Sequence, residues 1–458
     1  MLFGWALGLA SLGFSEPAWA DRGDWSLLLG GDAPIPEQKI ATDPRLPTGA
    51  PFETHDRPAE SSRACSLSLP LCVHANGSVT HAALLNGLDA LELAFARLID
   101  GLGLPPPLGD QGRGGSDHFD MYLLPPDRTT PGFERVRTFP DTPRPGGFDR
   151  ASGFCTALAD DPALLERAAT LCLGEAIALA FDPAETPHLR RAFATELWWT
   201  VALPTSLDFE AIERVQRRPT RALAARELSA DSEGSALLFD YLEAKLGAGE
   251  PGELSASLFS ASVQTTPASA PTWVNEPDVF DVLRHTFDES EPRMAELLGD
   301  LAVRRAFLGA RDDGAHWPEL AWSGAYGAVN LDWDLAWKSL PRRVRVTPVE
   351  PTGAVVVRLD LAEMPPGAPL GFQAEWEPPA AFQWTLVRLG SDGIELGRLV
   401  VPFQSRETKA EARLVNLADT KVVLAIGTHI ERVDVEQPFD PDVAPFEPHA
   451  AFVYLVTL

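Results

Sequence analysis

The chain has 458 residues, 45% of them hydrophobic, so it can bury a sizeable core and is long enough for two or three domains. Its formal net charge is -27 at pH 7, from 65 acidic and 38 basic residues, and this charge would repel nucleic acid and anionic membrane surfaces. The composition therefore argues against a nucleic-acid-binding protein and against a chain that is disordered throughout.

The first twenty residues predict a secretory signal. A short apolar run ends in Ala18–Ala20, an A-x-A pattern, and the polar residues Asp21–Asp24 follow. Cleavage is expected after Ala20, which indicates a secreted or periplasmic protein. No later stretch approaches the roughly 18 uncharged apolar residues that a membrane span needs, so no integral membrane span is expected. Residues 21–63 are rich in Pro, Gly, Asp and Glu without periodicity, and predict an extended leader.

Four cysteines fit an oxidising compartment and can pair in three ways. Cys65 and Cys72 bracket a short SLSLPL segment that a disulfide could close locally, which would leave Cys155 to pair with Cys172. This connectivity is favoured because free thiols in a secreted chain are exposed to oxidation. A zinc site made of the four cysteines is disfavoured, because neither pair has the short spacing of a zinc knuckle.

From Cys65 onward the chain predicts alternating strands and helices. Leu71–His74 is typical of a strand, Val79–Leu102 of a long helix, and Asp120–Leu124 of a second strand. Residues 125–150 are dense in Pro, Gly and Arg and predict a long surface loop. A strand, a helix and a strand followed by further helices indicate an α+β domain.

Helical patterns dominate the next part of the chain. Helices are predicted at Asp161–Phe181, Leu189–Val201, Ser232–Leu246 and Asp278–Leu308. Residues 182–187 break the chain between the first two helices, and the Ser, Thr and Pro cluster within 247–275 predicts a loop.

The last third of the chain changes to short alternating runs. From about Arg342, six such runs are separated by Pro, Gly and Asp clusters, which predicts a β-sandwich. The runs are VRVTPV, AVVVRLDL, AFQWTLVRL, ARLVNL, KVVLAIGT and AFVYLVTL. The predicted fold is therefore α+β, with a helix-rich domain over residues 64–340 and a C-terminal β-sandwich over residues 341–458.

The segment Leu171–Trp199 reads LCLGEAIALAFDPAETPHLRRAFATELWW. It resembles the active-site region of secreted bacterial gluzincin-like metalloproteases, which carry HExxH on one helix, an apolar stretch ending in Tyr-Asp or Phe-Asp, and EGxAxW on a second helix. Ala176–Asp182 matches the apolar stretch, and Ala192–Thr195 resembles the start of the second helix. Ser235–Gly247 resembles a further helix of the family, and the resemblance covers residues 65–310.

The resemblance implies that the zinc site has been lost. It places the two histidine ligands at Leu171 and Glu175, the general base at Cys172 and the third ligand at Arg191. Leucine cannot bind a metal ion and arginine would repel one, so neither zinc nor another cofactor is expected. A buried ion pair between Glu175 and Arg191 would then replace the metal as the link between the two helices. The alternative register, through Thr195–Trp199, keeps Glu196 but also lacks both histidines.

A hydrolase without the standard zinc ligands remains an alternative. Five side chains could converge once the helices pack, and paired carboxylates can perform acid–base chemistry. These side chains are Glu175, Glu185, His188, Glu196 and Glu233. The simpler interpretation makes Glu185 and Glu196 surface charges, or partners of Arg190 and Arg191.

The remaining motifs favour structural roles. Ser232–Ser235 lacks the pattern of a nucleophile elbow and predicts a helix N-cap. The acidic segments 312–314 and 440–442 lack the spacing of an EF-hand loop, so structural calcium is possible but unsupported. Four tryptophans could line a groove, although their spacing favours the core. They are Trp198, Trp199, Trp333 and Trp337.

These observations lead to one main functional hypothesis and two alternatives. The main hypothesis is a secreted, non-catalytic pseudo-metalloprotease that binds a peptide, protein or glycan through the vestigial cleft or the β-sandwich. The first alternative is a peptidase-like hydrolase with a non-standard carboxylate or metal site. The second is a structural protein of the cell envelope.

Overall fold

The computed structural model describes thirteen stretches of the chain and has an α+β fold. The described residues are 50–51, 55–127, 129–143, 150–159, 162–225, 227–247, 251–262, 272–273, 278–286, 291–378, 380–402, 408–432 and 447–457. The predicted signal peptide (residues 1–20), most of the predicted leader and the acidic segment 440–442 lie outside these residues.

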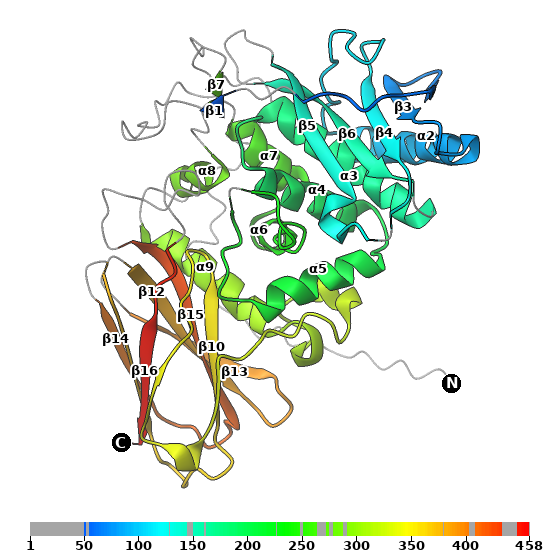
Figure 1. Ribbon diagram of the computed structural model, residues 1–458. Coiled ribbons are helices and arrows are strands. Elements are labelled where there is room, and N and C mark those ends of the chain that lie inside the picture. The colour runs from blue at the N-terminus through cyan, green and yellow to red at the C-terminus, as the bar shows by residue number, and fades with distance from the viewer. Residues whose placement is uncertain are drawn as a thin grey trace, which may run out of the picture. The chain divides into compact units, whose positions relative to one another are not determined.

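A five-stranded sheet of order β2-β3-β4-β6-β5 forms the N-terminal part (Figure 1). The strands are β2 (Ser62–Cys65), β3 (Leu71–Ala75), β4 (Phe119–Leu124), β5 (Val136–Pro143) and β6 (Ala151–Leu158). Strands β3, β4 and β6 are parallel, and β2 and β5 are antiparallel edges. The prediction of one long loop over residues 125–150 is therefore wrong, because an edge strand tolerates prolines such as Pro140 that a central strand excludes.

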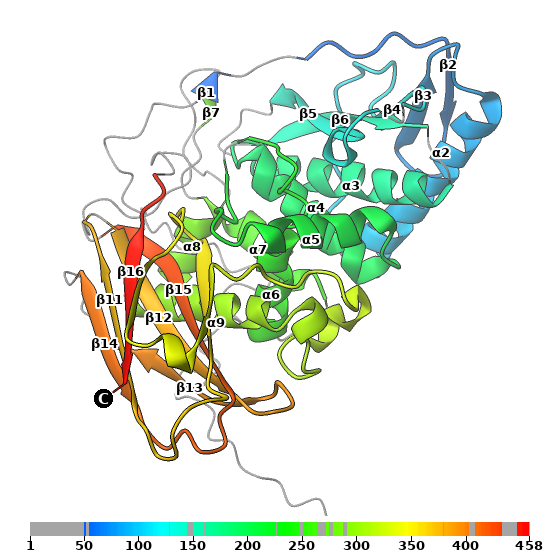
Figure 2. The same ribbon diagram turned by 60° about the horizontal axis from the view of Figure 1, so that its bottom comes forward.

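Helices α2 (His81–Phe95) and α3 (Pro162–Phe181) pack against this sheet, and both lie beside its strands in Figures 1 and 2. Thr80 caps α2 by accepting a hydrogen bond from the Ala83 amide at 3.1 Å. Gly87 allows the close approach of α2, because a Cβ atom there would lie 2.8 Å from Leu123 of β4. The π-helical turn η2 (Ala96–Gly101) extends α2.

Both predicted disulfides are confirmed. The bond between Cys65 and Cys72 joins β2 to β3, and the bond between Cys155 and Cys172 ties β6 to α3. The second bond crosses the boundary between the sheet and its covering helix, so it fixes α3 on the sheet.

Within the described residues, six further α-helices follow α3. They are α4 (Pro187–Val201), α5 (Ser206–Arg217), α6 (Ala236–Leu246), α7 (Glu253–Ala261), α8 (Val279–Thr286) and α9 (Glu291–Ala306). Helix α4 packs against both α3 and α6. Helix α7 lies inside the segment predicted as a loop, where Leu254 and Leu258 are buried at helical spacing.

Short elements connect the larger ones. The strands β1 (Ala50–Pro51) and β7 (Thr272–Trp273) pair with each other. The 3-10 turns are η3 (Gly132–Glu134), η4 (Gly309–Arg311), η5 (Pro318–Ser323) and η6 (Trp337–Ser339). In the part of the chain that the structure describes, no helix combines the length and the apolar character that crossing a membrane requires.

The C-terminal part is a β-sandwich, as predicted. Its sheets have the orders β13-β12-β15-β10-β8 and β14-β11-β16-β9, and they face each other in Figure 2. The strands are β8 (Trp333–Ala336), β9 (Arg342–Arg345), β10 (Ala354–Asp360), β11 (Leu370–Trp376), β12 (Ala380–Leu389), β13 (Glu395–Val401), β14 (Lys409–Leu414), β15 (Val422–Arg432) and β16 (Ala451–Thr457). Strand β8 precedes the predicted boundary at residue 341.

Aromatic side chains from both sheets fill the core of the sandwich. Phe372 of β11 lies 5.4 Å from Trp384 of β12, between ring centroids, and all 26 buried members of this core come from the sandwich and the residues leading into it. Helix α9 packs against β12 and β15, where Val303 and Phe307 join Ile426 in a second apolar cluster. The sandwich therefore has a core of its own and a helix on one sheet.

Candidate functional site

The positions that the resemblance assigns to the zinc site lie in the protein core. Leu171 and Cys172 of α3 are fully buried, and the Cys172 sulfur is bonded to Cys155. Glu175 lies one helical turn further on and is 4% exposed, and Arg191 of α4 is 0% exposed. These residues do not fit zinc, because Leu171 has no donor atom, the Cys172 sulfur is already bonded and Arg191 carries a positive charge.

The Arg191 guanidinium is the centre of a buried network. It donates hydrogen bonds to the carboxylate of Glu175 and, at 3.3 Å, to Oε1 of Glu233. It also donates to the backbone carbonyl oxygens of Phe133 at 3.0 Å and Val136 at 2.6 Å. The predicted ion pair between Glu175 and Arg191 is confirmed, and the same guanidinium ties α4 to the start of edge strand β5.

Glu233 connects this network to a second arginine. Arg167 of α3 donates to Oε2 of Glu233 and to Oδ1 of Asp208, both at 3.0 Å. Burial alone would raise the pKa of Asp208, but the charge and hydrogen bond of Arg167 lower it below its ordinary value. The indole N–H groups of Trp198 and Trp199 donate to the two oxygens of Asp208 at 3.0 and 3.1 Å. The network therefore runs from α3 to the partly exposed ring of Trp199.

The other predicted acid–base candidates do not join this network. Glu196 lies close enough to Glu243 and Asp240 of α6 to interact with their charges. Burial, together with the charge of Glu243, raises the pKa of Glu196 well above its ordinary value. Burial likewise raises the pKa of Asp240 to about 7. Glu185 is fully buried and accepts a hydrogen bond from the Val279 amide at 3.2 Å. The expectation that Glu185 and Glu196 lie at the surface is wrong, because Glu185, in the segment between α3 and α4, and Glu196, inside α4, are at most 2% exposed. The other expectation, that Arg190 is a partner, holds for Glu185, since the Arg190 guanidinium donates to the Glu185 backbone carbonyl oxygen.

His188 lies between two serines. Its Nε2 atom is 2.8 Å from Ser235 Oγ, and its Nδ1 atom is 3.0 Å from Ser232 Oγ. Burial lowers the pKa of His188 to about 4, so the ring is neutral at pH 7. Helix α6 begins at Ala236, so the N-cap predicted at Ser232 is wrong. All three side chains are buried, which leaves the serines closed to a substrate.

A second polar cluster, missed from the sequence, lies on the N-terminal sheet. Arg57 Nη2 contacts Asp110 Oδ2 at 2.6 Å and Asp141 Oδ2 at 2.5 Å, and the same guanidinium pairs with Asp120 of β4. The three aspartates are at most 1% exposed. His74 of β3 donates from Nε2 toward Asp120 Oδ1 at 2.8 Å.

The cluster shifts the titration of its members. Burial alone would lower the pKa of His74, but hydrogen bonds to Asp120 and Glu60 raise it above its ordinary value. Burial would raise the pKa of Asp120, but His74 and Arg57 lower it. No periodic pattern could have indicated this cluster, because Arg57 lies in the predicted leader, Asp141 in the predicted loop over residues 125–150, and Asp110 in a segment between a predicted helix and a predicted strand.

Four aromatic rings form a cluster next to Asp208. The Trp199 and Trp322 ring centroids are 5.6 Å apart, Phe209 lies 5.4 Å from Trp322, and Tyr326 lies 5.3 Å from Phe209. Tyr326 is 54% exposed, and the other three rings are partly exposed. We call these four residues the aromatic cluster. The groove of four tryptophans does not form, because Trp333 and Trp337 pack against the sandwich core instead.

Comparisons with known proteins give little information. No protein-family model matches the chain, and no curated protein matches it. Among solved structures, the chain is similar to the pre-peptidase C-terminal domain of a collagenase from Bacillus anthracis, with 9% sequence identity. The match covers 28% of this chain and 97% of that chain, and its TM-score of 0.18 is too low to support an argument.

Proposed function

We propose that the protein is a secreted, non-catalytic pseudo-metalloprotease that binds a peptide, protein or glycan at its surface. The observation that carries the proposal is the Arg191 guanidinium, which lies between the carboxylates of Glu175 and Glu233. The resemblance places the third zinc ligand at Arg191. The positive charge that a zinc ion would supply to the neighbouring carboxylates therefore comes from the Arg191 side chain. The two disulfides support export to an oxidising compartment.

The ligand surface that we propose is the aromatic cluster. The side chains at the vestigial metal positions are buried, so a ligand has to bind elsewhere. Trp and Tyr rings present a large rigid apolar face and a polar edge, which suits sugar rings and peptide side chains alike. Trp199 also donates its indole N–H to Asp208 at 3.1 Å, so the buried network holds one ring of the cluster in place.

The loss of catalysis is tested by metal content and hydrolysis. The purified full chain, dialysed against a weak chelator, is expected to hold far less than one zinc ion per chain and to leave a mixed peptide library intact. Reloading with zinc is expected to give no hydrolysis, because Leu171 and Arg191 cannot act as ligands. Stoichiometric zinc together with peptide cleavage would overturn the proposal and restore a hydrolase.

Binding is tested on peptide and glycan arrays with the full chain. Replacing both Trp322 and Tyr326 by Ala is expected to weaken binding of the captured ligand by about tenfold or more, because exposed aromatic residues dominate such contacts. Tyr454→Ala on β16 is the matched control, since it removes a partly exposed tyrosine from the sandwich. Equal loss in the control, or no loss in the double variant, would exclude the aromatic cluster as the binding surface.

A further inference from the structure

The two disulfides differ in their access to solvent. Cys155 and Cys172 are both 0% exposed. Cys65, in contrast, is partly exposed at the end of edge strand β2, while its partner Cys72 is buried on β3. Cys65 is therefore the one cysteine of the four that solvent reaches, and its disulfide is the one that an external thiol can approach.

Strands β2 and β3 are paired by backbone hydrogen bonds as well as by the Cys65–Cys72 disulfide. Cys65 and Cys72 are direct partners in the antiparallel pairing of β2 with β3. Backbone hydrogen bonds lie on either side, from the Ser66 amide to the Leu71 carbonyl and from the Ser61 amide to the Ala75 carbonyl, both at 2.9 Å. Because the bond spans only 7 positions of sequence, opening it frees little chain.

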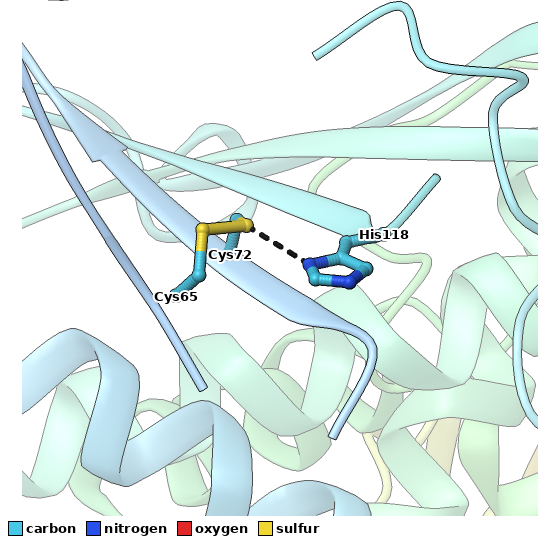
Figure 3. A group of neighbouring side chains, drawn as sticks. All are labelled: Cys65, Cys72 and His118. Atoms are coloured by element: carbon cyan, nitrogen blue, oxygen red, sulfur yellow. Dashed lines mark hydrogen bonds between the residues drawn. A yellow bond between two sulfur atoms is a disulfide. The ribbon is translucent and has the colours of Figure 1, made fainter. Parts of the chain in front are cut away.

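The buried sulfur has an imidazole beside it. His118 Nδ1 lies 3.2 Å from Cys72 Sγ, and Figure 3 shows the ring next to that sulfur, on the side away from Cys65. Ser116 Oγ lies 3.6 Å from the same atom. A ring nitrogen of His74 and a carboxylate oxygen of Asp120 also lie within 4.8 Å of the Cys72 sulfur. An N–H donor at this distance stabilises a thiolate, and a stabilised thiolate is the better leaving group in disulfide exchange.

We propose that Cys65–Cys72 is a thiol–disulfide exchange site with His118 as its catalytic residue, and that its partner is a dithiol. A thiolate of the dithiol attacks Cys65 Sγ, the bond between the two cysteine sulfurs breaks, and its electron pair goes to Cys72 Sγ. His118 donates a hydrogen bond or proton to that sulfur. The second thiol of the partner then attacks the partner's own sulfur in the mixed disulfide, and Cys65 Sγ leaves as a thiolate and takes up the proton that the second thiol loses. The protein disulfide is reduced by two electrons, and the dithiol is oxidised to its own disulfide.

The first test measures which disulfide opens. The folded full chain is treated with increasing dithiothreitol, alkylated, digested and mapped by mass spectrometry. Alkylation is expected at Cys65 and Cys72 at reductant concentrations that leave Cys155 and Cys172 bonded, with an unchanged far-ultraviolet circular dichroism spectrum. Simultaneous opening of both disulfides, or opening only after unfolding, would overturn the proposal.

The second test measures the rate of opening. His118→Ala is expected to slow reduction by dithiothreitol at pH 7 by about tenfold or more, because the leaving sulfur loses its donor. His81→Ala, an exposed histidine at the start of α2, should react like the unchanged chain. A variant that keeps its melting temperature and reacts at the unchanged rate would remove His118 from the mechanism. If His118→Ala fails to fold, His118→Phe provides the same comparison, because it keeps a ring and removes the N–H donor.

Discussion

Replacing Arg191 by Met is expected to lower the free energy of unfolding by about 3–5 kcal/mol, because removing one partner leaves buried charges uncompensated. Glu175 loses its guanidinium, Glu233 keeps only Arg167, and the carbonyl oxygens of Phe133 and Val136 lose their donor. Urea denaturation followed by circular dichroism measures the change, because the midpoint and slope together give the free energy.

An exposed ion pair provides the control for Arg191. Arg343 contacts Glu375 at 3.2 Å on the sandwich, with both side chains about half exposed. Arg343→Met is expected to cost less than about 1 kcal/mol, because solvent screens such pairs. In a Glu175→Gln background the cost of Arg191→Met should shrink, since one buried charge has already been removed. Equal midpoints for Arg191→Met and Arg343→Met would refute the role of the network in joining α3 to α4.

The parts of the fold that were predicted correctly are those with a local signal. Helix α4 has Thr186 as its N-cap and Pro187 in its first turn, and the sequence places both at a clear break. Strand β6 was missed because it is buried on both faces and so lacks alternation. Strand β13 was missed for the opposite reason, since it is an edge strand with exposed residues such as Leu396 and Val400.

The candidate site also contains contacts that the sequence could predict and contacts that it could not. The contact between Glu175 and Arg191 could be predicted because both residues lie on consecutive helices whose register a resemblance supplied. The contact of Arg191 with Glu233 could not, since it depends on how the turn before α6 packs against α4. The pairing of Arg57 with Asp110, Asp120 and Asp141 had no sequence signal, because these residues lie far apart in the chain and only Asp120 belongs to a predicted strand.

Arg57 is expected to be as important for stability as Arg191, although it lies in the segment predicted as a leader. Arg57→Met removes the shared partner of three buried aspartates and is expected to cost at least about 3–5 kcal/mol at pH 7. Arg97→Met is the control, since Arg97 pairs with Glu166 where both side chains are about 30% exposed. Arg57→Met should lower the melting temperature and the urea midpoint much more than Arg97→Met does.

The pH dependence distinguishes the loss of a charge partner from a loss of packing. In the unchanged protein the pKa of Asp120 is below its ordinary value of 3.8. Ionised Asp120 therefore stabilises the fold fully above pH 3.8, and this stabilisation is lost as the pH falls through the pKa of Asp120 in the folded protein. In Arg57→Met, burial without the guanidinium raises the pKa of Asp110 further above its ordinary value and removes one of the two charges that lower the pKa of Asp120. The folded variant then keeps protons that the unfolded chain releases, so its stability rises as pH falls toward 4. The stability that Arg57→Met loses relative to the unchanged protein should therefore be largest at pH 7 and smaller near pH 4. A packing defect would instead lower the free energy of unfolding by the same amount at both pH values.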